Sequence, residues 1–357
     1  MKKKALIAMS GGVDSSVAAY LMKQQGYDCT GITMKLFENQ DIGIGSDKTC
    51  CSLEDAEDAR RVASSLDIPF YVSNFTPYFK EAVIDRFIKA YQNGATPNPC
   101  IDCNRKMKYD KLFSRAAQLD MDYIVTGHYA RVEYDTEAGR WLLKKALDVS
   151  KDQSYVLYFL TQTQLAHTMF PLGGLHKSET REIAVREGFV NADKRDSQDI
   201  CFVRDGDYAG FIETYTGKLS ESGDFIDTHG NVLGRHKGLI RYTVGQRKGL
   251  EISMNRPMYV KSKDAIKNTV TICDEHELFT SSLDADDINL ITYESIETPL
   301  RVKAKIRYSQ PEQWATAIQT SQDTLHIEFD EPQRAISKGQ AVVLYDGDTV
   351  VAGGTIT

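Results

Sequence analysis

The stretch KKALIAMSGGVDSSVAAYLM at residues 3–22 decides the fold of the first part of the chain. Its residues 5–9 form a short apolar run, which is typical of a buried strand. Val13, Val17 and Leu21 then recur at helical spacing. The sequence therefore predicts a strand, a glycine turn and a helix, the repeating unit of a parallel α/β sheet.

The alternation of strands and helices continues for about two hundred residues, as expected for helices that cover a parallel sheet. In such folds ligands bind at the carboxyl ends of the strands. The further expected strands are residues 29–36, 70–73 and 123–126, and the further expected helices are residues 53–66, 78–91 and 108–119.

Short alternating segments replace the helices beyond about residue 206. Residues 300–308 (LRVKAKIRY) alternate apolar and basic side chains, and Leu325, Ile327 and Phe329 alternate with polar ones. Residues 341–357 suggest a closing hairpin, so we predict a small all-β barrel. The predicted domains are an α/β catalytic domain over residues 1–205, a linking domain over 206–283 and a C-terminal β-barrel over 284–357.

Composition narrows the class of protein. Hydrophobic residues make up 41% and charged residues 26%, as in soluble globular proteins. No apolar run approaches the ~20 residues of a membrane span, and the apolar start breaks at once into glycines, so we expect a cytoplasmic protein without a membrane partner. The net charge of −7 argues against indiscriminate binding to nucleic acid but leaves room for a local basic face.

The glycine turn at residues 10–16 (SGGVDSS) has the features of a phosphate-binding loop. Its glycines let backbone N–H groups approach an anion, and Ser15 and Ser16 open a helix whose N-terminus favours negative charge. Asp14 is a candidate Mg²⁺ or ribose contact. An ordinary strand-to-helix turn is the alternative. The whole heptad, however, resembles the SGGxDSS signature of the PP-loop ATP pyrophosphatases, which adenylate a carbonyl oxygen and lack the Walker lysine.

The seven cysteines are an odd number in a long chain without a signal peptide, which disfavours a disulfide scaffold. Cys100 and Cys103 precede a basic helix, and cations near a helix N-terminus stabilise a thiolate. Cys201 follows a basic pair, Lys194 and Arg195. Both Cys103 and Cys201 are therefore candidate reactive thiols.

The other cysteines have plainer interpretations. Cys29 and Cys273 are expected to be small buried side chains. Cys50 and Cys51 are adjacent, which is unusual geometry for a four-thiolate zinc site with Cys100 and Cys103, so we favour a structural role for them.

Several long motifs follow the glycine turn along the chain. They are residues 49–52 (TCCS), 96–100 (TPNPC), 103–104 (CN), 126–129 (TGHY), 151–155 (KDQSY), 196–202 (DSQDICF) and 243–250 (TVGQRKGL). Their order resembles that of the bacterial tRNA-specific 2-thiouridylase family, and the resemblance covers essentially the whole chain, from the first strand to Gly353 and Gly354. One departure is Cys100, where some members carry aspartate.

The resemblance implies that ATP and Mg²⁺ are needed, that Cys103 is the nucleophile and that Cys201 carries a persulfide. It also implies tRNA as substrate, expectedly the acceptors for lysine, glutamate and glutamine, and a cysteine desulfurase or sulfur-relay protein as sulfur donor. The implied nucleotide contacts are Ala8, Met9, Ser10, Gly11, Gly12, Val13, Asp14, Ser15, Met34 and Gly127. The implied contacts to the target base or tRNA are Asn98, Pro99, Cys100, Lys151, Asp152, Gln153, Arg307 and Tyr308.

Two basic segments support RNA binding independently of the family. Arg301, Lys303, Lys305 and Arg307 would project from one face of one strand with no acid among them. A solvated edge strand is the alternative interpretation. The second segment lies in the linking domain and comprises Arg235, His236, Lys237, Arg241, Arg247 and Lys248.

The predicted reaction replaces the C2 oxygen of a wobble uridine, activated by adenylation, with sulfur from the Cys201 persulfide. The base must leave its stack, which costs little in an anticodon loop. Alternatives are the same reaction through a [4Fe-4S] cluster held by Cys100, Cys103 and Cys201, a PP-loop synthetase acting on a small molecule, and a non-catalytic RNA-binding protein.

Overall fold

The structure is a computed structural model of the 357-residue chain. It divides into two compact units, which are described separately below. The first unit comprises residues 1–83, 100–202 and 347–351, and the second comprises 84–99, 203–346 and 352–357. The residues that the structure describes are 2–38, 53–196, 199–203, 206–252 and 255–357.

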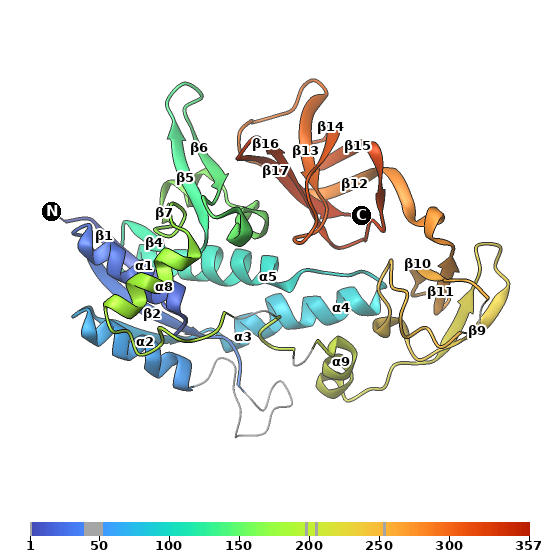
Figure 1. The fold of residues 1–357 in the computed structure, drawn as a ribbon, viewed down its shortest axis with the longest axis horizontal. Helices are drawn as coiled ribbons and strands as arrows, with labels where there is room; N and C mark the ends of the chain where they lie inside the picture. The colour runs from blue at the N-terminus through green and yellow to red at the C-terminus, as the bar shows by residue number, and fades with distance from the viewer. Residues whose placement is uncertain (1, 39–52, 197–198, 204–205, 253–254) are drawn as a thin grey trace. The chain divides into compact units, whose positions relative to one another are not determined.

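A parallel sheet forms the centre of the first unit, as the alternating pattern predicts (Figure 1). Each strand pairs with its neighbour in parallel, and β1 lies between β2 and β4. The expected strands are therefore confirmed, with ends shifted by a residue or so. In sheet order the strands are β3 (Phe70–Asn74), β2 (Asp28–Lys35), β1 (Lys4–Ala8), β4 (Tyr123–Val125) and β7 (Thr168–Met169).

Helices cover both faces of this sheet. Alternate residues of the first strand point to opposite faces, so Ala5 and Ile7 pack in one core and Leu6 and Ala8 in another. The first core is closed by α1 (Val13–Gln24), α2 (Leu53–Ser65) and α8 (Lys177–Arg186). The second core is closed by η3 (Cys103–Leu112), a π-helix, and α6 (Phe113–Gln118).

Two predicted helices differ from the structure in detail. The helix expected over 108–119 already begins with α5 (Pro99–Asp102), before the π-helix. The helix expected over 78–91 comprises α3 (Thr76–Phe79), the π-helix η2 (Lys80–Asp85) and α4 (Arg86–Gln92). Both contain π-helical turns, which bond residue i to residue i+5 and are common at functional sites.

The first unit also contains an antiparallel hairpin, formed by β5 (Ala130–Asp135) and β6 (Arg140–Lys145). Part of β17 (Thr349–Ile356) pairs with β6, because Thr349 lies opposite Lys144. The Arg131 guanidinium also donates to Asp348 at 2.6 Å. The second strand of the predicted closing hairpin, β17, therefore begins in the first unit and ends in the second. The short helices here are η4 (Val149–Lys151), η5 (Ser154–Leu157) and α7 (Gln162–Ala166).

The second unit contains the expected linking region. Its sheet has the order β10-β11-β8-β9 and packs around Phe225, Tyr242 and Val260. Its elements are α9 (Tyr208–Thr216), β8 (Gly223–Ile226), β9 (Val232–His236), η6 (Leu239–Arg241), β10 (Tyr259–Asp264), β11 (Thr269–Cys273) and η7 (Glu275–Leu278).

The predicted β-barrel follows and is confirmed. It runs β12-β15-β14-β13-β16-β17 and closes where Ile356 pairs with Ala285. Leu325, Ile327 and Phe329 are buried, as their alternation predicts. Its strands are β12 (Phe279–Leu290), β13 (Leu300–Lys305), β14 (Gln313–Ser321), β15 (Thr324–Arg334), β16 (Ala341–Asp346) and β17. Among the described residues, no helix is long and apolar enough to cross a membrane.

Candidate active site

The glycine turn between β1 and α1 is held in shape by its own side chains and by a distant asparagine. Ser15 donates from Oγ to the Gly12 carbonyl at 3.0 Å. Asn191 donates from Nδ2 to the Gly11 carbonyl at 2.9 Å. Gly11 has φ +78°, and a Cβ there would overlap the carbonyl oxygen of Asp55. The first N–H groups of α1 have no partner within the helix, so the turn presents donors for an anion.

Gly127 lies after β4 and against this turn. A Cβ on Gly127 would lie 2.8 Å from the Asp14 carbonyl carbon and from the Ser15 nitrogen. We expect Gly127→Ala to displace the turn and weaken ATP binding by on the order of tenfold or more. The matched control is Gly174→Ala, whose Cβ would meet no described atom within 4 Å. Calorimetric titration with ATP measures both, and equal affinities for the two variants would contradict a nucleotide site here.

Several predicted nucleotide contacts have buried side chains. Ala8, Met9 and Val13 pack into the two cores, so only their backbone can face a nucleotide. Met34 packs beside Ile32 near the carboxyl end of β2. The predicted contacts thus gather at the carboxyl ends of β1, β2 and β4, where ligands bind in open α/β sheets.

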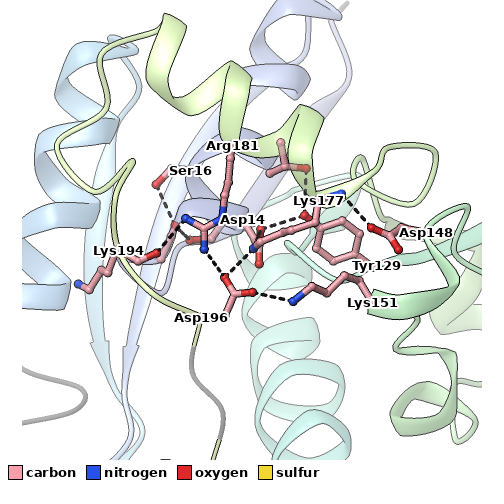
Figure 2. A network of polar contacts seen from close by, with 12 residues as sticks. Asp14, Ser16, Tyr129, Asp148, Lys151, Lys177, Arg181, Lys194 and Asp196 are labelled. Carbon is pink, nitrogen blue, oxygen red and sulfur yellow. Dashed lines mark hydrogen bonds and ion pairs between the residues drawn. The ribbon is translucent and has the colours of Figure 1, made fainter.

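A network of ion pairs adjoins the turn (Figure 2). The Lys177 ammonium lies 2.6 Å from Oδ1 of Asp14 and 2.8 Å from Oδ1 of Asp196. Asp196 also binds Lys151 at 2.9 Å and Arg181 at 3.0 Å. Burial opposes ionisation of Asp196, yet the hydrogen bonds and charges of Lys177 and Lys151 lower its pKa to about 2. Asp196 is therefore an anion at neutral pH.

Lys177 and Arg181 were not among the sequence-predicted site residues. Tyr129 also belongs to the network, because its hydroxyl donates to Asp14 at 3.0 Å and lies 2.9 Å from Oγ1 of Thr180. The sequence carries no signal for these contacts, since 163 residues separate Asp14 from Lys177.

The predicted reactive cysteines share one lysine, Lys108, within their electrostatic range. Cys100 and Cys201 are exposed, and Cys103 is partly buried at the start of η3. Because a π-helix bonds residue i to residue i+5, Lys108 lies one turn from Cys103 on the same side. Burial lowers the pKa of Lys108, and the charges of Cys103, Cys100 and Cys201 act in the opposite direction. All three thiols are therefore within electrostatic reach of this cation.

The thiols differ in their surroundings. Cys100 reaches solvent, yet the protein atoms around it raise its pKa by desolvation, while Lys108 lowers it. Burial raises the pKa of Cys29 and of Cys273 to about 11. The prediction that these two cysteines are buried is confirmed.

His128 fixes the position of Lys108. The Lys108 Nζ lies 3.3 Å from His128 Nε2, and His128 Nδ1 lies 2.7 Å from Thr126 Oγ1. Burial, and then the charge of Lys108, hold the pKa of His128 well below its usual value. His128 is therefore neutral, and when Lys108 is charged Nε2 accepts from it and Nδ1 donates to Thr126.

One member of the basic pair before Cys201 is paired with acids. Lys194 binds Asp55 and lies 2.9 Å from Asp58, both on α2. Lys108 is a further cation within electrostatic range of Cys201.

The predicted tRNA contacts at 151–153 mostly bond within the protein. Asp152 is buried and accepts from the backbone N–H groups of Ala146 and Ser154. Gln153 accepts from the Tyr129 N–H at 3.0 Å. Asn98 and Pro99 come immediately before Cys100, and Pro99 is buried.

The predicted basic strand face is confirmed only in part. Arg301, Lys303 and Lys305 alternate with buried side chains along β13, and Asp330 of β15 pairs with Arg301 at 2.6 Å. Arg307 lies beyond the end of β13 and donates to the Ala335 carbonyl at 2.7 Å and to Ser337. Tyr308 is exposed, and it lines a cavity of about 230 Å³ together with Arg307 and Gln340.

The second basic segment is also largely neutralised. Arg235, Lys237 and Arg241 pair with Asp224, Glu251 and Glu213. His236 is buried, which lowers its pKa. Arg247 and Lys248 are exposed.

A metal centre is not formed by the residues that the structure describes. Within them, no three His, Cys, Asp or Glu side chains gather as a metal-binding group. The interpretation of Cys50 and Cys51 lies outside the described residues.

Comparison with protein families matches the chain in three consecutive parts. A model described as tRNA methyl transferase HUP domain matches residues 3–205. A tRNA methyl transferase PRC-barrel domain matches residues 209–274, and an aminomethyltransferase beta-barrel domain matches residues 280–356.

Curated relatives match over the full length. The tRNA-specific 2-thiouridylase MnmA of Clostridioides difficile (strain 630) is 53% identical over 356 residues, which cover 100% of this chain and 98% of that protein. The tRNA-specific 2-thiouridylase MnmA 1 of Thermoanaerobacter sp. (strain X514) is 51% identical, covering 100% and 99%. A solved 4-thiouridine synthetase–RNA complex with bound ATP aligns with 56% of this chain and 44% of that chain, at 17% identity and a TM-score of 0.35. The chain belongs to the tRNA-specific 2-thiouridylase family.

Proposed function

We propose that this chain is an ATP-dependent tRNA-uridine 2-sulfurtransferase, which works in the cytoplasm and replaces the C2 oxygen of the wobble uridine with sulfur. The observation that carries the proposal is that the glycine turn and Cys100, Cys103 and Cys201 lie in one compact unit, where all three thiols are within electrostatic range of Lys108. Activation by a nucleotide and transfer of sulfur by thiols need both sets of residues. The family to which the chain belongs supports tRNA as the substrate.

The first step adenylates the C2 oxygen of uridine and releases pyrophosphate. The glycine turn and the N-terminus of α1 hold the phosphates through backbone N–H groups. Asp14 would be the carboxylate that holds a Mg²⁺ ion accompanying those phosphates, since this ion prefers one or two carboxylates plus substrate oxygens. When bound, the ion supplies neutralising charge to the phosphates.

The second step transfers sulfur. The terminal sulfur of the Cys201 persulfide attacks C2 of uridine and AMP departs. The Cys103 thiolate then attacks the Cys201 sulfur, which forms a Cys103–Cys201 disulfide and leaves 2-thiouridine on the tRNA. An external thiol must reduce the disulfide. A cysteine desulfurase or a sulfur-relay protein reloads Cys201, and the expected acceptors are the tRNAs for lysine, glutamate and glutamine.

The proposal is tested by anaerobic incubation with ATP, Mg²⁺, unmodified tRNA and a cysteine desulfurase with cysteine, whose persulfide sulfur can be passed to Cys201, followed by nucleoside analysis for 2-thiouridine. Wild type, Cys100→Ser, Cys103→Ser and Cys201→Ser are compared with and without iron reconstitution. We expect product that needs Cys103 and Cys201 but neither Cys100 nor iron. If 2-thiouridine formation needs all three thiols and iron, the reaction uses an iron–sulfur cluster and the persulfide route is wrong. If a small acid rather than tRNA stimulates AMP release, the proposal that tRNA is the substrate is wrong.

A further inference from the structure

The glycine turn lacks a cation of its own. Residues 10–16 contain no lysine or arginine, whereas a polyphosphate carries several negative charges. Backbone N–H groups and a helix N-terminus offset only part of that charge. A second element must therefore supply the positive charge beside the turn.

Helix α8 brings two cations to this place (Figure 2). Lys177 and Arg181 are four residues apart, so their side chains lie on one side of the helix. Lys177 is only 8% exposed and contacts Asp14, which is in the first turn of α1. Burying an ammonium group is costly unless anions surround it, so the position of Lys177 needs an anionic partner.

Asp196 is the anion that both cations share. Its Oδ1 lies 2.8 Å from Lys177 and 3.0 Å from Arg181, and its Oδ2 lies 2.9 Å from Lys151. Three cations against the two carboxylates of Asp14 and Asp196 leave one positive charge in excess. The Asp196 carboxylate thus lies among hydrogen-bond donors and positive charges that could also bind a larger anion.

We propose that Lys177 and Arg181 bind the β- and γ-phosphates of ATP, and that the carboxylate of Asp196 occupies their site until nucleotide arrives. This inference rests on ATP as the substrate of the proposed function. The exchange is anion for anion, since Asp196 is ionised at neutral pH. It breaks no covalent bond, and Lys151 remains available as a partner for the displaced carboxylate.

The exchange takes place close in sequence to the reactive thiol, because Asp196 precedes Cys201 by five residues. AMP, which lacks the β- and γ-phosphates, would leave Asp196 where it is.

Calorimetric titration of the full-length protein with ATP, pyrophosphate and AMP tests the inference. We expect Lys177→Met and Arg181→Met each to weaken ATP and pyrophosphate binding about tenfold or more, with AMP binding changed less than about twofold. Asp196→Asn removes the competing charge and should tighten ATP and pyrophosphate binding severalfold. The matched control is Arg186→Met on the same helix, because Arg186 pairs only with its neighbour Glu187 among the ion pairs that the described residues form.

Equal losses for AMP and ATP in the two cation variants would reduce these residues to a structural role and overturn the inference. Weaker ATP binding by Asp196→Asn would overturn the competition. If Lys177 proves necessary for folding, Arg181→Met, which alters a partly exposed side chain, decides the question. If the variants form 2-thiouridine normally and bind ATP as wild type does, only this inference is wrong. If the variants show the expected binding pattern but wild type forms no 2-thiouridine, only the proposed function is wrong.

Discussion

Replacing Cys201 with serine is expected to lower the rate of 2-thiouridine formation on the order of 10³-fold or more, the scale of losing a covalent catalytic group. A serine hydroxyl stays protonated at neutral pH and cannot carry a persulfide. Cys201 is exposed and interacts with the charge of Lys108, so its thiol can be loaded and kept reactive. Tritium- or mass-labelled tRNA, digested to nucleosides, measures the product directly.

The matched control is Cys29→Ala, because Cys29 is buried and its pKa is raised to about 11. We expect this variant to form 2-thiouridine at close to the wild-type rate. Pyrophosphate should still be released with tRNA in Cys201→Ser, since adenylation precedes sulfur transfer. Undiminished thiolation by Cys201→Ser would remove the persulfide from the mechanism.

Lys108→Met is expected to make the thiols around it less reactive. A nearby cation favours the thiolate, so its loss should raise the pKa of Cys103 by about one unit or more and slow alkylation at neutral pH about tenfold per unit. Alkylation with iodoacetamide across pH, followed by peptide mass analysis of Cys103 and Cys201, measures this. The neighbouring variant Lys106→Met is the control, because Lys106 pairs with Asp110 at 3.3 Å.

The sign of the pH dependence follows from Lys108 itself. Burial lowers its pKa, so its charge is present below that lowered pKa and is lost as the pH rises through it. In wild type the thiolates lose this support at high pH, and the alkylation rates of wild type and Lys108→Met should then converge. Identical pH profiles for the two proteins would show that Lys108 does not act on the thiols.

Local periodicity made most of the fold predictable. Apolar residues recur at helical spacing after residue 12 and alternate with polar ones over 325–329. Each pattern indicates which face of the helix or strand is buried, and burial of these apolar faces stabilises the sheet and the barrel. The helix that contains Lys108 was predicted to start too late, because residues 99–107 are mostly polar or cysteine, and their aliphatic side chains, Ile101 and Met107, are six residues apart and form no helical repeat. Pro99 at its first position was the available start signal.

Contacts between distant parts of the chain could not be predicted in this way. The sequence suggested that the nearby positive charge of Lys194 stabilises the Cys201 thiolate. In the fold, Lys194 pairs with acids of α2, and Lys108 lies within electrostatic range of the thiols. Likewise, Arg301 looked unopposed within its own strand, and its acid partner Asp330 comes from β15. Such pairs depend on which strands and helices become neighbours, and side-chain type along one segment does not record that.

The pairing of β17 with β6 has a consequence for biosynthesis. Thr349 follows Lys144, its partner, by 205 residues, and nearly all of the linking domain and barrel are translated in between. Domains generally fold in order as the ribosome makes them. Here the edge of the β5–β6 hairpin has to wait for its partner strand until the barrel has been made. A stalled or shortened nascent chain would therefore expose that edge to other chains, even though every residue of the glycine turn and the thiol cluster had already emerged.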